Sequence, residues 1–175
     1  MISTFTPLHF NRSETTICTA HTFADIFDLA NAFLSLNSMT HKKLQKLCYY
    51  AKAWYLAIND VNLIKEPFEA WVHGAVQPML YQKYKSYGFQ LIPMYLDSIS
   101  KLPEEFIDFA KEIYCSYGDL SGDDLEKLNH SELPWLNARK GVFPWQNSYN
   151  VISEEDMKSY YRSLLKNESC AKTEY

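Results

Sequence analysis

The sequence lacks the features on which several enzyme classes depend. Of its 175 residues only five are glycines, and none lies in a phosphate-binding loop with lysine or in a G-x-S-x-G nucleophile turn. The H-E-x-x-H motif of zinc hydrolases is also missing. Ser121 in "LSGDDL" is better explained as a helix N-cap than as a nucleophile. We therefore expect no catalytic residues and a protein that is not an enzyme.

The four cysteines are spread along the chain without a C-x-x-C pair, which gives no support to a zinc ribbon or a redox motif. His73, Cys115 and His130 have metal-binding side chains, but ligands so far apart in the sequence carry almost no specificity. Both histidines are better explained as hydrogen-bonded structural residues. We expect no metal and no cofactor.

Long hydrophobic runs are missing too. No stretch approaches the roughly 18 apolar residues of a transmembrane helix, and the N-terminal segment lacks the basic and apolar regions of a signal peptide. We expect a cytoplasmic protein without membrane contact, whose cysteines are reduced. A chain of this length is sufficient for one domain with its own hydrophobic core.

The charges are unevenly distributed around a net charge of −4. Residues 40–90 hold seven lysines and three acids, whereas residues 101–132 hold three lysines and nine acids. The stretch "HKKLQKLCYYAK" combines cations with aromatic rings, as nucleic-acid-binding surfaces do. The net negative charge and the lack of a helix-turn-helix pattern argue against DNA binding by the protein alone. A DNA-binding regulator of its own operon remains the alternative from another class.

Apolar residues recur at helical spacing through most of the chain, which predicts a mainly α fold. We expect a single compact domain of five to seven helices, with room for a small β-hairpin near residues 63 to 73. One helix begins after the N-cap residue Thr40, and its apolar stripe includes Leu44, Leu47 and Trp54. The high aromatic content, with 13 tyrosines, suggests partly exposed contact surface.

Local signals place the other helices and the ends of the domain. Further helices are predicted to start at Thr22, Pro78, Pro103, Ser121 and Ser153, and two of them to stop at Gly88 and Gly118. The expected division is an N-terminal arm at 1–21, the domain at 22–166 and a polar C-terminal tail at 167–175.

The polar side chains of the helix after Thr40 are the first candidates for contact with another protein. Tyr49 and Lys52 have i, i+3 spacing on one flank, and Lys46 lies opposite the apolar stripe. The complete candidate set for partner binding is Lys46, Tyr49, Tyr50, Lys52, Trp71 and His73.

Four separated blocks carry a resemblance to a known family: "KKLQKLCYYAKAWYLA", "EPFEAWVHGAVQPMLYQKYKSYG", "LEKLNHSELPWLNAR" and "ISEEDMKSYYRSLL". Their order and spacing resemble the Panacea domain family of SocA-like antitoxins, which includes GepA-type phage-associated proteins. The resemblance implies a mainly α-helical antitoxin, often found in prophages, that neutralises a toxin encoded beside it by direct binding. For the SocA branch it implies instead an adaptor that presents the toxin to a AAA+ protease.

The resemblance also assigns a structural motif. Its residues are Leu44, Gln45, Leu47, Gly74, His130, Pro134, Trp135 and Arg139. One departure is visible, because the family usually has G-P-V where this chain has Gly74, Ala75 and Val76. Without the proline the turn is expected to be looser. We also expect His130 and Trp135 to lock their segment against the aromatic helix that follows Thr40.

Overall fold

The computed structural model describes residues 25–95 and 102–171, with side chains up to residue 166. These residues form seven α-helices, which confirms the mainly α fold. They are α1 (Ile26–Leu36), α2 (His41–Asn59), α3 (Pro78–Tyr84), α4 (Glu104–Tyr117), α5 (Gly122–Ser131), α6 (Leu133–Ala138) and α7 (Glu154–Ala171). None of the helices in this part of the chain is long and apolar enough to cross a lipid bilayer.

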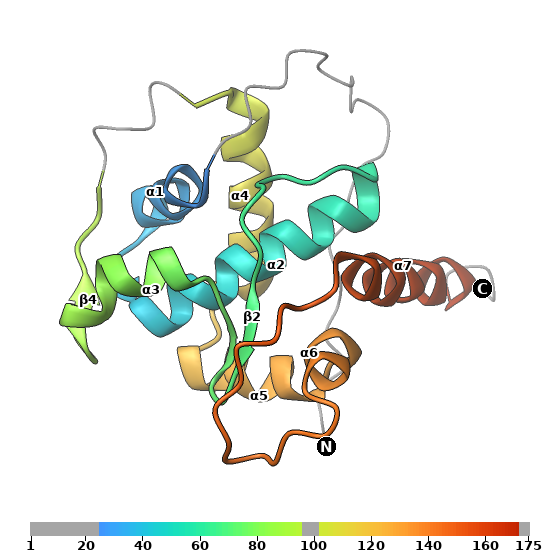
Figure 1. Ribbon diagram of the computed structural model, residues 1–175. Coiled ribbons are helices and arrows are strands. Elements are labelled where there is room, and N and C mark those ends of the chain that lie inside the picture. The colour runs from blue at the N-terminus through green and yellow to red at the C-terminus, as the bar shows by residue number, and fades with distance from the viewer. Residues whose placement is uncertain (1–24, 96–101, 172–175) are drawn as a thin grey trace.

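Helix α2 is the centre of the domain. Figure 1 shows it running through the middle, with α1 and α4 on one side and α5, α6 and α7 on the other. It packs against α1, α3, α4, α5 and α7. Thirteen of its 19 residues are buried, including polar ones. A helix that is covered on nearly every side has no solvent-facing flank, and this differs from the amphipathic surface helix that the sequence predicts.

The predicted start and stop signals are confirmed for most helices. The Thr40 hydroxyl accepts a hydrogen bond from the Lys43 amide at 3.3 Å, and Ser121 and Asp124 form a reciprocal capping box. Ser153 accepts from the amide three residues later at 3.2 Å. Pro78 is the first residue of α3, Pro103 is the N-cap of α4, Gly118 follows α4, and Gly88 follows the 3₁₀ turn Lys85–Tyr87 that extends α3.

The start of α1 and the end of α7 differ from the sequence-based prediction. Helix α1 is capped by Asp25, whose side chain accepts from the Phe27 and Asp28 amides, so the predicted start at Thr22 is wrong. Thr22 and the expected arm at 1–21 lie outside the described residues. Helix α7 continues to Ala171, beyond the expected tail boundary at residue 167.

Two small antiparallel pairs of strands accompany the helices. Strand β1 (Met39–Thr40) pairs with β4 (Leu91–Ile92), and β2 (Glu69–Trp71) pairs with β3 (Gly74–Val76). The predicted hairpin therefore exists but is centred a few residues later than 63 to 73. The segment before α7 lies along β2, because the Ala70 amide donates to the Asn150 carbonyl at 2.8 Å. Figure 1 shows this segment passing beside β2 on its way to α7.

The core is rich in aromatic rings. Tyr50 stacks on Tyr117 with ring centroids 4.3 Å apart, and the Trp54 indole donates to the Tyr117 hydroxyl at 2.7 Å. Tyr161 of α7 meets Trp54 edge to face at 4.9 Å. Part of the tyrosine surplus therefore serves the interior of the domain, where Tyr49, Tyr50, Tyr84, Tyr117 and Tyr161 are buried.

Candidate functional site

The β2–β3 hairpin carries the only two of the six predicted partner-binding residues that reach the surface. Trp71 is half-buried at the end of β2, and the His73 side chain, in the turn, is 75% exposed. The other four residues, Lys46, Tyr49, Tyr50 and Lys52, are at most 1% exposed. Their predicted place on an exposed flank is wrong. The β2–β3 hairpin, the segment before it, the end of α5 and the start of α7 contact these side chains and cover them.

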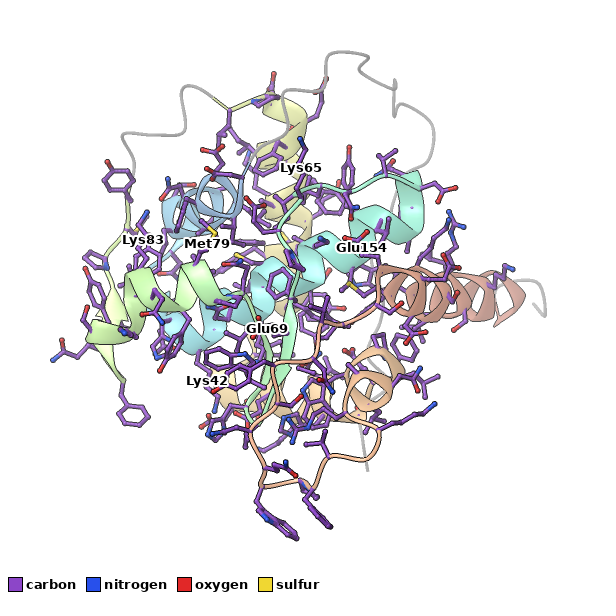
Figure 2. The ribbon with its side chains drawn as sticks, viewed as in Figure 1. Lys42, Lys65, Glu69, Met79, Lys83 and Glu154 are labelled. Atoms are coloured by element: carbon purple, nitrogen blue, oxygen red, sulfur yellow. The ribbon has the colours of Figure 1, made fainter. Side chains whose placement is uncertain are left out.

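The two buried lysines hold backbone in place. Lys46 donates to the carbonyl oxygens of His73 at 2.6 Å and Ala75 at 2.9 Å, and so fixes the hairpin turn on α2. Burial lowers the pKa of its ammonium group to about 7. Lys52 pairs with Glu154 at the start of α7 at 2.8 Å and donates to the Glu66 carbonyl at 2.9 Å. Figure 2 labels Glu154 beside the C-terminal half of α2.

The two buried tyrosines of α2 also have internal roles. Tyr50, Tyr161 and the Asn129 amide all point their donors at one oxygen, Oε2 of Glu132, at 3.4, 2.9 and 3.2 Å. Burial raises the pKa of the Glu132 carboxyl to about 7. Tyr49 packs edge to face on Phe68, which precedes β2, at 5.6 Å. These groups position α5 and α7 against α2.

Trp135 locks the α5–α6 corner onto the hairpin. Its indole N–H donates to the Trp71 carbonyl at 3.1 Å, and the His130 ring stacks on it at 4.2 Å. The expected lock between His130 and Trp135 is therefore present, but it holds β2 and not the aromatic helix α2. Pro134 is buried in the first turn of α6 beside it.

The other motif residues shape the same region. Leu44 and Leu47 are fully buried, and the Gln45 side chain makes two hydrogen bonds to the Gln77 backbone, at 2.8 and 3.2 Å. Gly74 has φ +92°, and a Cβ there would lie 2.6 Å from the Lys46 nitrogen. Only glycine fits both conditions.

The alanine that replaces the family's usual proline does not loosen the turn. The Ala75 amide, which a proline would lack, donates to the buried Asn129 side chain at 2.7 Å. Asn129 is itself fixed by its bond to Glu132. The restored donor is used, so the expectation of a looser turn is wrong.

Arg139 links the hairpin to the loop that follows α6. Its guanidinium donates to the carbonyl of Ala70 at 2.9 Å, and to those of Phe143 at 3.0 Å and Gln146 at 2.7 Å. We call Lys46, Asn129, Trp135 and Arg139 the hairpin clamp, because each donates or accepts a hydrogen bond at the β2–β3 backbone. All four are buried.

Two hollows flank the hairpin. One, of about 540 Å³, lies between the hairpin and the start of α2 and is lined by His41, Gln45 and Tyr81 among others. The second, of about 230 Å³, lies toward the loop after α6. Trp71 and His73 line both hollows. Figure 2 labels Lys42 and Glu69 on this side of the molecule.

Sequence reasoning missed a group of exposed apolar side chains beside the second hollow. Trp145 is 77% exposed, Tyr149 68%, Phe143 62% and Val151 56%. All belong to the segment "GVFPWQNSYNV", from Gly141 to Val151, which contains no charged residue. That combination of aromatic residues with no charge was the available signal. We call Phe143, Trp145 and Tyr149, with the backbone between them, the aromatic loop.

The basic stretch of α2 does not form a basic surface. Lys42 pairs with Asp123 at 2.6 Å and with Glu126, and Lys43 donates to the Gly118 carbonyl. With Lys46 and Lys52 buried, the four lysines of this stretch all contact the protein itself. The observation that suggested DNA binding thus loses its structural basis. No group of three metal-binding side chains occurs within 25–95 and 102–171.

The described residues thus form a helical domain with a clamped hairpin flanked by two hollows and an exposed aromatic loop. The family model described as "Antitoxin SocA-like, Panacea domain" matches residues 44–136, more than half of the chain. The chain therefore belongs to the SocA-like, Panacea-domain antitoxin family. No match was found among curated proteins or among solved structures.

Proposed function

We propose that this protein is a cytoplasmic antitoxin that neutralises a protein toxin by binding it directly, as a binding protein and not as an enzyme. Family membership supports an antitoxin-type role. The observation that carries the proposal is the position of Trp71 and His73, which reach the surface between two hollows while their backbone is held by buried side chains.

Rigidity of this kind favours binding. A surface whose backbone is already ordered loses little conformational entropy when a partner docks, so more of the contact energy appears as affinity. Aromatic side chains at the edge of a hollow are also the residues that most often dominate protein interfaces. The hairpin tip, residues 71–73, combines both properties.

The test uses the product of the gene beside this one. We expect that protein to arrest growth when expressed alone, and we expect co-expression of this chain to restore growth. The two proteins should also co-purify from the restored cells. A neighbouring product that is harmless, or one that arrests growth but neither co-purifies with this chain nor is counteracted by it, would contradict the proposal.

Direct neutralisation and delivery to a AAA+ protease are separated by the lifetime of the toxin. Sequestration predicts that the toxin's half-life in the cell is unchanged or longer when this chain is present. Delivery predicts a shorter half-life that recovers when the protease is deleted. We expect the toxin's half-life to be unchanged or longer.

A further inference from the structure

The aromatic loop presents an unusual amount of uncovered apolar surface. Phe143 and Trp145 stack with ring centroids 5.1 Å apart and an interplanar angle of 11°, so the two rings form one two-layered aromatic block that remains largely exposed to solvent. Tyr149 meets Trp71 edge to face at 5.9 Å, which joins the loop to the hairpin tip. Figure 2 shows side chains of the loop between α6 and α7 projecting away from the body. Exposed apolar surface of this extent is typical of interaction sites.

The backbone under these rings is firmly held. Arg139 donates to the carbonyls of Phe143 and Gln146 from inside the domain. The Gln146 amide donates back to the Phe143 carbonyl at 3.0 Å, and the Asn150 side chain donates to the Ala138 carbonyl at 2.8 Å. The exposed rings therefore belong to an ordered turn, which distinguishes them from apolar residues on a flexible loop.

The chemistry of the segment indicates a protein as its occupant. Nucleic acid and anionic lipid surfaces are bound through exposed lysine and arginine, and Gly141–Val151 contains neither. Two cations precede the segment: Lys140 is a single exposed charge, and Arg139 is 5% exposed with its donors pointing at backbone carbonyls, so no cluster of exposed cations lies within or directly before Gly141–Val151. Tryptophan, tyrosine and phenylalanine next to asparagine, glutamine and serine are a composition found at protein interfaces.

We propose that the aromatic loop is the surface on which the toxin docks, with Trp145 as the anchor residue against an apolar patch of the toxin. This inference rests on the proposed function and specifies its binding site. The loop lies beyond residues 44–136, the part of the chain that the family model matches. The family region thus supplies the clamp residues Lys46, Asn129 and Trp135, and the following segment supplies a contact surface particular to this chain's own partner.

The test measures binding of the purified neighbouring-gene toxin to the wild-type protein and to Trp145→Ala by calorimetry. We expect Trp145→Ala to bind roughly 30-fold or more weakly, as interface anchors do when truncated. The matched control is Leu91→Ala in β4, which removes a 58% exposed side chain outside the loop and should bind within about threefold of wild type. All three proteins should give the same circular dichroism spectrum.

A second readout keeps Trp145 in place. A photo-crosslinking phenylalanine derivative at position 143, which stacks on Trp145, should form a covalent product with the toxin, and the same derivative at position 91 should not. Sedimentation of the protein without toxin should be unchanged by Trp145→Ala.

The outcomes separate the two proposals. If the wild-type protein does not bind the toxin, the proposed function fails and the docking surface with it. If wild type binds and Trp145→Ala binds equally well, only the docking surface is wrong. A Trp145→Ala protein that dissociates from dimer to monomer, or loses binding to phosphatidylcholine vesicles, while still binding the toxin would assign the loop to a second copy or to a membrane and overturn the inference.

Discussion

The hairpin clamp and the aromatic loop lie next to each other in the structure and use the same residue type in opposite ways. Trp135 of the clamp is 8% exposed, donates to the Trp71 carbonyl and is stacked by His130. Trp145 of the loop is 77% exposed and stacks on its exposed neighbour Phe143. The Trp135 indole is buried and stabilises the fold, whereas the Trp145 indole is exposed to solvent.

This contrast separates motif residues from contact residues. Polar side chains such as Lys46 and Arg139 are placed where backbone carbonyls need donors, and truncating them affects the fold first. The loop residues have their backbone held by others and their side chains free of buried hydrogen bonds. A surface built in this way can change its contacts without disturbing the core.

The largest effect is expected from reversing the charge in the clamp. Lys46→Glu places a buried carboxylate against two carbonyl oxygens that now accept from an ammonium group. We expect the free energy of unfolding to fall by roughly 3 to 5 kcal/mol, measured by urea denaturation. Lys140→Glu, at an exposed position, is the control and should change it by less than about 0.5 kcal/mol. Equal stability of the two variants would show that Lys46 is not a clamp residue.

A smaller effect is expected from introducing the proline that the family usually has. Ala75→Pro removes the amide that donates to Asn129 and leaves the buried Asn129 oxygen without that donor. We expect a loss of about 1 to 3 kcal/mol in urea denaturation. The double variant with Asn129→Ala should lose less than the sum of the two single changes, because they share one hydrogen bond. A stabilising Ala75→Pro would contradict this account of the turn.

An effect of comparable size is expected from pH. The folded-state pKa of Glu132 is raised from 4.5 to about 7, so the folded protein retains a proton that the unfolded chain releases. Stability from this group is complete below pH 4.5 and is lost as the pH rises through 7. Between pH 5 and 7.5 the wild-type protein should lose roughly 2 kcal/mol more than Glu132→Gln, which does not titrate. If the free energy of unfolding depended on pH in the same way for both proteins, the Glu132 carboxyl would not be the group that causes the loss of stability.

Local features of the fold could be predicted from the sequence. N-caps such as Thr40 and Ser121 act through the next three residues, so short sequence windows contain the whole interaction. The hairpin was placed too early because alternation of apolar residues does not locate the turn. The turn is fixed by Gly74, whose requirement for positive φ and for space beside Lys46 involves a residue on another element.

The candidate site was predicted less well, for a related reason. The pattern of α2 identifies one apolar stripe but does not reveal how many helices will pack around it, so Lys46, Tyr49, Tyr50 and Lys52 were expected at the surface and are buried. The aromatic loop has no helical or strand period and matches no functional motif, so sequence patterns do not identify it. Its exposure follows from tertiary contacts of Arg139 that the sequence does not display.

The most direct test of the contrast is the stability of two tryptophan variants measured side by side in urea. Trp135→Ala should lower the free energy of unfolding by roughly 3 to 5 kcal/mol, as truncation of a buried aromatic residue does. Trp145→Ala should change it by less than about 0.5 kcal/mol. A Trp135→Ala protein as stable as wild type, or a Trp145→Ala protein destabilised to the same extent, would contradict the division between a clamp that holds the fold and a loop that meets the partner.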